Sequence, residues 1–217
     1  MSWNKKLLAD VLFGVQIIGA LVLSGSQFFR LLETTQGQLL SMFLIMEGFL
    51  CLNLMLAIGS HRAQPSRITK QTVWTYIMWL VLIGSNILAI FLNGHYQWSP
   101  NDTRTSLLAI GGAVVVFTVT KIQGVGLKDP MSKSLLAMIF KAMPQFVMTF
   151  EIAQKGGAGV PAAALIAGHI TVLTRIGQIW LAIREAGWDR NRVWLGASEA
   201  ANEISWIAVT AAWIFSQ

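Results

Sequence analysis

Apolar residues recur in long runs along the whole chain, and short polar segments separate the runs. A helical run of about 20 apolar residues is long enough to cross the hydrocarbon core of a bilayer. The pattern predicts seven helices, over residues 10–31, 38–59, 71–93, 105–123, 133–153, 159–183 and 192–215. The sequence therefore predicts an all-α membrane protein with seven transmembrane helices.

The composition agrees with this class. Of the 217 residues 54% are hydrophobic and 12% are charged, whereas a soluble domain has about 25% charged residues. The single cysteine, Cys51, lies within an apolar run, which argues against a disulfide framework. The net charge of +6 fits the loops of a membrane protein, so no nucleic-acid partner is expected.

The distribution of basic residues predicts the orientation. The N-terminus and the loops after the second, fourth and sixth helices carry eleven of them: Lys5, Lys6, Arg62, Arg67, Lys70, Lys121, Lys128, Lys133, Arg184, Arg190 and Arg192. The opposite face carries three, Arg30, Arg104 and Lys155. Because cytoplasmic loops are enriched in Lys and Arg, we expect a cytoplasmic N-terminus and an external C-terminus, in an inner or plasma membrane.

A weak internal repeat relates the two halves of the chain. With an offset of 118, Gln27 falls on Gln145, Glu33 on Glu151 and Gln36 on Gln154, and two residues of slippage bring Gly48 onto Gly168 and Trp74 onto Trp194. The matches keep their order over three helices. We expect three helices, a linker helix and three helices, with both repeats entering the membrane in the same direction. The predicted domains are residues 1–98, the linker 99–128 and residues 129–217.

The fifth predicted helix contains the sequence FKAMPQFVMTFEIAQ, residues 140–154. Pro144 lacks a backbone N–H and clashes with the preceding turn, so it predicts a kink or hinge. Gln145 is the nearest polar side chain that can satisfy the freed carbonyl group. The alternative is a kinked spanning helix with no further role.

The three-plus-one-plus-three pattern, Met143-Pro144-Gln145 and the degenerate Gly25-Ser26-Gln27 together resemble the PQ-loop and SWEET (MtN3-like) transporters. The resemblance implies two triple-helix bundles, each packed in the order one, three, two, with a solute cavity between them and Pro144 as a hinge. Two features depart from that pattern. Ser26 stands where the first repeat would have proline, and SWEET proteins have an external N-terminus. Nicotinamide riboside transporters share the architecture, but their W-x-x-W signature is absent.

Ionisable side chains at membrane depth are costly and are functional candidates by default. On the last predicted helix Glu199, Glu203, Trp206 and Thr210 are spaced by 4, 3 and 4 residues and share a face. At 1.5 Å per residue, Glu203 lies roughly 16 Å from the inner boundary. The candidate solute-binding residues are Gln27, Glu47, Asn86, Gln145, His169, Asn202 and Trp206, and the candidates for proton coupling or ion pairing are Glu203, Glu199, Arg175 and Lys141. We expect them to converge on a wet pocket between the halves.

The depths predict specific neighbours. Arg175 is expected beside Glu199, with Lys141 at the same level, and His169 near Glu203. Two carboxylates four residues apart repel each other, so one of them can hold a proton. In the alternative interpretation Arg175 or Lys141 neutralises Glu199 permanently and the cluster is structural, while His169 is a packing residue.

The sequence thus predicts a transporter that moves a small polar solute, zwitterionic or cationic and amino-acid-like, by alternating access with proton coupling. A sugar or vitamin facilitator of the same fold, a seven-helix receptor or interaction protein, and a membrane enzyme remain alternatives. H-E-x-x-H, G-x-S-x-G, Walker and metal-spacing motifs are absent from the sequence, so no catalytic residue, metal or cofactor is expected. The expected partners are the lipid bilayer and the solute, and a homo-oligomer is left open.

Overall fold

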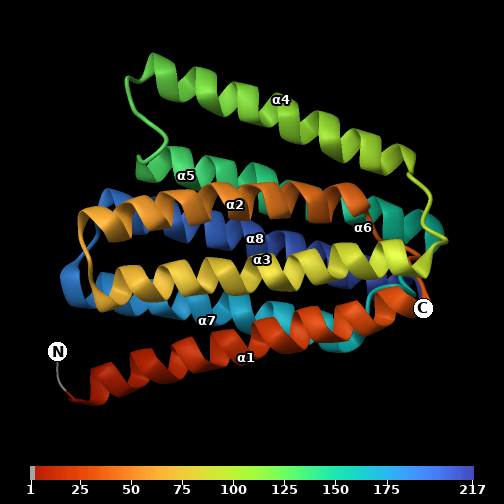
Figure 1. The fold of residues 1–217 in the computed structure, drawn as a ribbon, viewed down its shortest axis with the longest axis horizontal. Helices are drawn as coiled ribbons and strands as arrows, with labels where there is room; N and C mark the ends of the chain where they lie inside the picture. Colours follow the sequence, from red (N-terminus) through yellow and green to blue (C-terminus); the bar gives the residue numbers. More distant parts are fainter. Residues whose placement is uncertain (1–2) are drawn as a thin grey trace.

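The structure, a computed structural model, describes the backbone of residues 3–217 and their side chains except at positions 3–6, 9, 67 and 68. The side chains of Lys5, Lys6 and Arg67, which enter the charge count, lie outside the described residues. Figure 1 shows long helices lying roughly along one axis. They are α1 (Trp3–Glu33), α2 (Leu40–Ala63), α3 (Arg67–Asn93), α4 (Pro100–Ile122), α5 (Pro130–Ala137), η1 (Met138–Ala142), α6 (Met143–Lys155), α7 (Ala162–Ala186) and α8 (Arg190–Phe215).

Within the described residues, six helical segments are long and apolar enough to cross a membrane. They correspond to α1, α2, α3, α4, the continuous segment Pro130–Lys155 and α7. The helix α8 has 26 residues and is also long enough to span, but Glu199 and Glu203 make it more polar. The chain is therefore a helical integral membrane protein, as the apolar runs predicted.

The starts of α4 and α7 differ from the predicted ones because of residues that flank the apolar run. The helix α4 begins at Pro100, five residues before the predicted start, because Ser99 and Asp102 form a reciprocal capping box and Pro100 occupies the first turn. The helix α7 begins at Ala162, after the extended residue Pro161. Hydropathy alone does not register either signal.

The segment α5–η1–α6 contains the irregularity expected near Pro144. The backbone N–H of Met143 donates to the carbonyl of Met138, five residues back, where an α-helix would use the carbonyl four residues back. Pro144 follows directly in the first turn of α6 and contributes no donor. A single π-helical turn therefore accommodates the proline.

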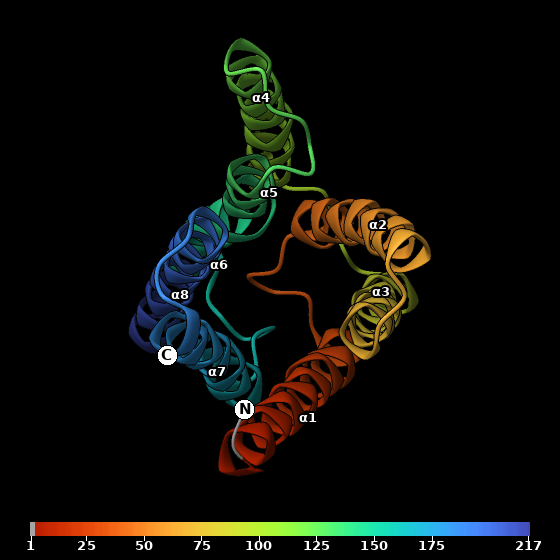
Figure 2. The same cartoon turned by 90° about the vertical axis from the view of Figure 1, so that its left-hand side faces the viewer.

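For description, we refer to α1, α2 and α3 as the first group and to α5–η1–α6, α7 and α8 as the second group. The helix α3 contacts both α1 and α2, and α8 contacts both α7 and the α5–η1–α6 segment. The groups meet where α1 packs along α7 and, on the other side, where α2 meets η1 and α6. The helix α4 contacts α2 and α6 and so covers this second seam. In the end-on view of Figure 2 the helices surround the connecting loops at the far end.

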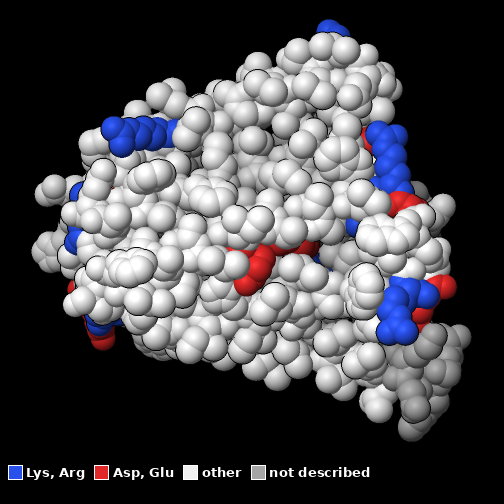
Figure 3. All heavy atoms as spheres, turned by 180° about the vertical axis from the view of Figure 1, so that it is seen from behind, with Lys and Arg blue, Asp and Glu red and all other residues white. Residues whose placement is uncertain are grey.

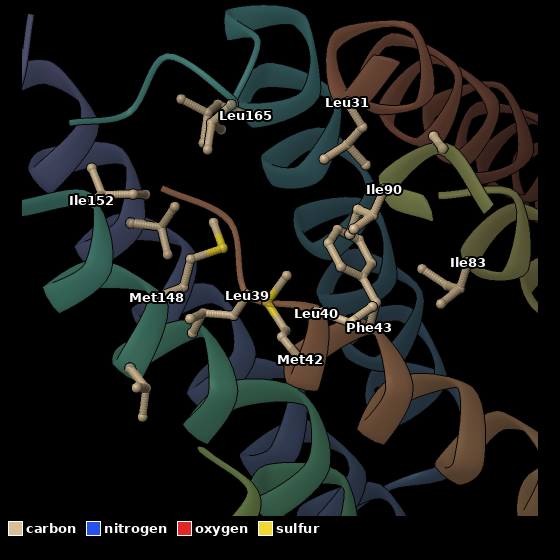
Figure 4. Close-up of a cluster of buried hydrophobic side chains, with 14 residues drawn as sticks. Leu31, Leu39, Leu40, Met42, Phe43, Ile83, Ile90, Met148, Ile152 and Leu165 are labelled. Atoms are coloured by element: carbon tan, nitrogen blue, oxygen red, sulfur yellow. The ribbon is translucent and has the colours of Figure 1, made fainter. Parts of the chain in front are cut away.

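A cluster of buried apolar side chains joins the two groups near the end of the molecule that carries loops 34–39 and 156–161, which we term the outer end. Leu31, Leu39 and Phe43 meet Met148 and Ile152 there. Figure 4 shows these side chains converging from α1, α2 and α6, with Leu165 of α7 beside them. Burial of a large apolar side chain contributes about 1.5–3 kcal/mol where water is excluded, so this cluster holds the outer end together.

Candidate functional site

His169 on α7 and Glu203 on α8 are in direct contact, as their predicted depths indicated. His169 Nδ1 lies 2.6 Å from Glu203 Oε1, and His169 Nε2 lies 2.9 Å from the hydroxyl of Thr210. The side chains of His169 and Glu203 are 24% and 13% exposed. The contact places an imidazole, a carboxylate and a hydroxyl in one line near the midpoint of α8.

Glu199 pairs with Lys141 and not with Arg175, which corrects one expectation. Lys141 Nζ lies 3.5 Å from Glu199 Oε2, whereas Arg175 donates to Gln178 Oε1 at 3.2 Å on its own helix. The reason is lateral position: η1 packs against α8 and turns Lys141 toward Glu199. Equal depth along the bilayer normal does not determine which neighbouring helix a side chain faces.

Gln145 is buried at the interface of α6 and α8. Its Oε1 accepts a hydrogen bond from the hydroxyl of Ser205 at 2.5 Å. The polar side chain beside the proline therefore ties two helices together, and the amide is used between helices and not on the freed backbone carbonyl. Asn202 lies one turn before Ser205 and is 4% exposed.

Asn86 and Glu47 belong to the first group of helices. Asn86 on α3 is fully buried and donates to the hydroxyl of Ser24 at 3.1 Å, and that hydroxyl donates to the carbonyl of Leu82 at 2.8 Å. Glu47 on α2 faces α3, since a methyl group added at Gly84 would lie 3.7 Å from its Oε1. The hydrogen bonds of Asn86 thus stay in the first group, and those of Gln145 and His169 stay in the second.

Several predicted site residues carry buried oxygen atoms without a hydrogen-bond partner. Among the described residues these atoms are Glu47 Oε2, Asn86 Oδ1, Asn202 Oδ1 and Glu203 Oε2, together with Ser41 Oγ. Leaving a buried acceptor unpaired costs about 1–3 kcal/mol. Four of the five atoms belong to residues that the sequence singled out, two from each group of helices.

Gln27 and Trp206 do not share a pocket with Gln145. Gln27 Nε2 donates to the carbonyl of Gly159 at 2.8 Å, at the outer end. Trp206 packs over Gly168, where a methyl group would lie 3.1 Å from the indole ring, and its ring centroid is 6.3 Å from that of His169. The expected repeat partners Gln27 and Gln145 are therefore used differently.

The outer end is closed by a set of bonds that sequence analysis missed. We define the outer clasp as loops 34–39 and 156–160 with Gln27 and Arg30. Gln38 donates to the carbonyl of Gly159 at 3.0 Å, Arg30 donates to the carbonyl of Ala158 at 2.6 Å, and the amide of Gly159 donates to the carbonyl of Gln36 at 2.9 Å. A methyl group at Gly37 would lie 2.4 Å from the carbonyl oxygen of Gly156, so the two backbones touch.

The start of α4 is anchored to both groups. Asn101 donates to Glu151 Oε2 on α6 at 2.7 Å, and Glu151 also pairs with Lys155 at 2.7 Å. The next residue, Asp102, accepts from the backbone N–H of Ser41 at 2.9 Å and from the hydroxyl of Tyr96. Burial and the Asp102 hydrogen bond raise the pKa of Tyr96 well above its usual value. These anchors border a hollow of about 170 Å³ at the outer end.

Charged side chains are unevenly distributed along the molecule. On the face in Figure 3, Lys and Arg side chains gather toward the two ends, and acidic atoms lie in a furrow near the middle of an otherwise uncharged surface. In the described part of the chain no three His, Cys, Asp or Glu side chains are grouped closely enough to hold a metal ion. No protein-family model, curated protein or solved structure matches this chain.

Proposed function

We propose that this protein is a transporter of a small polar solute, with seven spans arranged as two triple-helix bundles and α4 as the linker. The neighbour relations support this arrangement. The third helix of each proposed bundle, α3 or α8, lies between the other two. The two bundles thus have the same internal order, which the sequence repeat and the PQ-loop and SWEET resemblance both imply.

The observation that carries the proposal is the set of unpartnered buried acceptors on α2, α3 and α8. Glu47 and Asn86 contribute two from the first bundle, and Asn202 and Glu203 contribute two from the second. Purely structural polar groups in a membrane are normally paired, because the bilayer offers no water to replace a missing partner. Oxygen acceptors complement N–H donors, which favours a zwitterionic or cationic, amino-acid-like solute.

Glu203 is the residue proposed to couple transport to protons. Its Oε1 lies 2.6 Å from His169 Nδ1, so the proposed proton path runs through the hydrogen bond between these two side chains. The neighbouring carboxylate, Glu199, lies 3.5 Å from the ammonium group of Lys141, so we assign the coupling role to Glu203, whose partner is a histidine. One remaining oxygen of Glu203 is available to a solute ammonium group.

The proposed cycle is alternating access, with the outer clasp as a closed outer gate. In this conformation the solute would exchange through the opposite, inner end. The π-helical turn before Pro144 is the place where the α5–α6 segment would bend, since helices kink at π-bulges and at proline. The predicted excess of basic residues on the face that carries the N-terminus is the reason for placing the inner end in the cytoplasm.

The test is uptake into sealed proteoliposomes. Labelled amino acids, amines, sugars and vitamins are offered with and without a pH gradient. We expect at least one amino-acid-like solute to accumulate, with faster uptake when the gradient drives protons in the same direction. Glu203→Gln should transport without responding to the gradient, and the exposed control Glu185→Gln should respond like the unmodified protein. Binding of a solute without movement across the bilayer would reject transport, and a gradient response retained in Glu203→Gln would reject its coupling role.

A further inference from the structure

A groove of about 440 Å³ lies between α1 and α3, away from the outer clasp and the site described above. Its lining residues are Phe13, Ile17, Lys70, Gln71, Trp74, Thr75 and Met78. Figure 1 shows that α1 diverges from α3 toward the N-terminal end of α1. Both helices are among the segments that are long and apolar enough to span a membrane, so the groove borders lipid.

The groove is polar at one end and apolar along its length. Lys70 and Gln71 lie in the first turns of α3, followed by Trp74 and Met78 one and two turns further on, with Phe13 and Ile17 on the opposite wall. The eight residue steps from Lys70 to Met78 cover about 12 Å at 1.5 Å per residue. One leaflet of hydrocarbon is about 15 Å deep, half of the 30 Å core. The groove thus runs from the membrane surface into one leaflet.

Lys70 is an exposed cation at the polar end of this groove. None of the ion pairs between described side chains involves it. The wall opposite Lys70 is formed by α1. Its nearest acidic residue in the sequence is Asp10, one turn before Phe13, and Asp10 has an interaction of its own. His61 at the end of α2 is bonded to Thr69. The charge of Lys70 is therefore available to an anion at the level of the lipid head groups.

We propose that this groove binds one anionic phospholipid, with an acyl chain between α1 and α3 and the phosphate at Lys70. The apolar walls and the depth match an acyl chain, and the free cation matches the phosphate. Trp74, which is 61% exposed, sits at the level where aromatic side chains contact the interface. The proposal depends on membrane insertion only and is independent of transport.

Native mass spectrometry of the purified protein tests it directly. The protein is incubated with phosphatidylglycerol or phosphatidylcholine of identical acyl chains, and the lipid retained per chain is counted. We expect phosphatidylglycerol to bind about fivefold more tightly, the factor that about 1 kcal/mol per basic residue near the surface corresponds to. Lys70→Gln should remove this preference, and Lys121→Gln, which alters an exposed lysine at the end of α4 outside the groove, should keep it.

A second variant tests the apolar part of the groove. Met78→Trp fills it and should reduce retention of both lipids, whereas Leu108→Trp on the lipid-facing side of α4 should not. Lys70→Gln is expected to fold normally because it alters an exposed side chain, so its result stands alone if Met78→Trp is unstable. The proposal is overturned if the unmodified protein binds both lipids equally, or if Lys121→Gln loses the preference for phosphatidylglycerol as Lys70→Gln does. It is also overturned if millimolar inorganic phosphate displaces the lipid, or if the protein forms a lipid-free dimer that buries the groove.

Discussion

His169 uses both ring nitrogens, one toward Glu203 and one toward Thr210. A neutral imidazole has one donor and one acceptor nitrogen. An ionised carboxylate can only accept, so it selects the tautomer with hydrogen on Nδ1, and the Thr210 hydroxyl then donates to Nε2. Thr210 is thus a positioning residue that keeps His169 aligned with Glu203, and the same hydroxyl can accept a hydrogen bond once the ring is protonated.

Replacement of Thr210 tests this alignment. Thr210→Val keeps the shape but leaves Nε2 of a partly buried ring without a partner, which should lower the free energy of unfolding by about 1–3 kcal/mol. Thr210→Ser retains the hydroxyl and should stay within about 0.5 kcal/mol of the unmodified protein. Thermal unfolding of both variants in detergent measures the difference. Equal stabilities would mean that the hydroxyl does not hold the ring.

Tyr96 gives a prediction about alkaline pH outside the spanning segments. Its pKa is raised above the usual 10.0 by burial and by the bond to Asp102. A raised folded-state pKa means that the folded protein keeps this proton when the unfolded chain loses it, so the stabilisation is complete below pH 10 and declines as pH rises further.

Tyr96→Phe should therefore have two opposite effects on unfolding. Near neutral pH it should be less stable by about 1 kcal/mol or more, because Asp102 and the backbone N–H of Leu40 lose a partner. Above pH 10 its stability should fall less steeply than that of the unmodified protein. Unfolding curves from pH 7 to pH 11 check both parts, and parallel curves for the two proteins would contradict the assignment.

At the scale of helices, α4 is the element whose packing is least evident from sequence. It is apolar all round, yet it contacts α2, α6 and η1 along one side. Gly112 marks that side, because a methyl group there would lie 2.8 Å from Ile139 of η1, while Gly111 has open space. Gly112 therefore faces the protein, and the adjacent Gly111 faces lipid.

These glycines form a matched pair for substitution. Gly112→Leu should separate α4 from η1 and destabilise the protein by about 1–3 kcal/mol through overpacking. Gly111→Leu makes the same gain in helix propensity, about 1 kcal/mol, and meets no neighbour, so it should be neutral or stabilising. Thermal unfolding of the two variants measures the difference. A stable Gly112→Leu would show that α4 is not docked on η1.

At the scale of the whole molecule, the contacts between the two groups of helices differ between the outer end and the rest of the helices. The outer end combines the outer clasp, the apolar cluster and the anchors of α4. Farther along the helices, the predicted site residues keep unpartnered acceptors in both groups. The proposed outward-closed transporter corresponds to this arrangement, with closure at one end and unpaired acceptors further along the helices.

Alanine substitutions at Gly37 and Gly94 distinguish the effect of opening the outer clasp from the effect of backbone strain. Both have φ in the left-handed region, +77° and +74°, but only Gly37 touches the opposite loop. Alanine at either position is strained, whereas Gly37→Ala also pushes the carbonyl of Gly156 away. Gly37→Ala should therefore open the outer clasp and expose Gln38, a residue that is only 2% exposed in the unmodified protein.

Cysteine labelling reads out this opening. In a Cys51→Ala background, Gln38→Cys should react slowly with a water-soluble maleimide. Adding Gly37→Ala should speed the reaction at least about tenfold, as expected when hydrogen bonds worth about 1.4 kcal/mol are lost. Adding Gly94→Ala should leave the rate unchanged. Similar acceleration by both alanines would attribute the effect to strain alone.

The sequence by itself determined the class of protein and several local features. Runs of apolar residues predicted a helical membrane protein, which the structure confirms. Pro144 predicted a kink or hinge because a residue without an N–H must interrupt the helical bonds, and the structure has a π-helical turn directly before it. The spacing of residues along α7 and α8 predicted that His169 meets Glu203, since depth follows from counting residues. The family resemblance, the solute and the coupling stay predictions.

Only the tertiary structure decided which helices are neighbours and which way each one is rotated. That is why Lys141, and not Arg175, reaches Glu199, and why Gln27 binds a loop carbonyl instead of sharing a pocket with Gln145. The outer clasp was hidden for a related reason: its acceptors are backbone carbonyls, which every residue carries and which no sequence pattern marks. Hydropathy and spacing describe position along a helix, whereas contacts depend on rotation about its axis and on packing between helices.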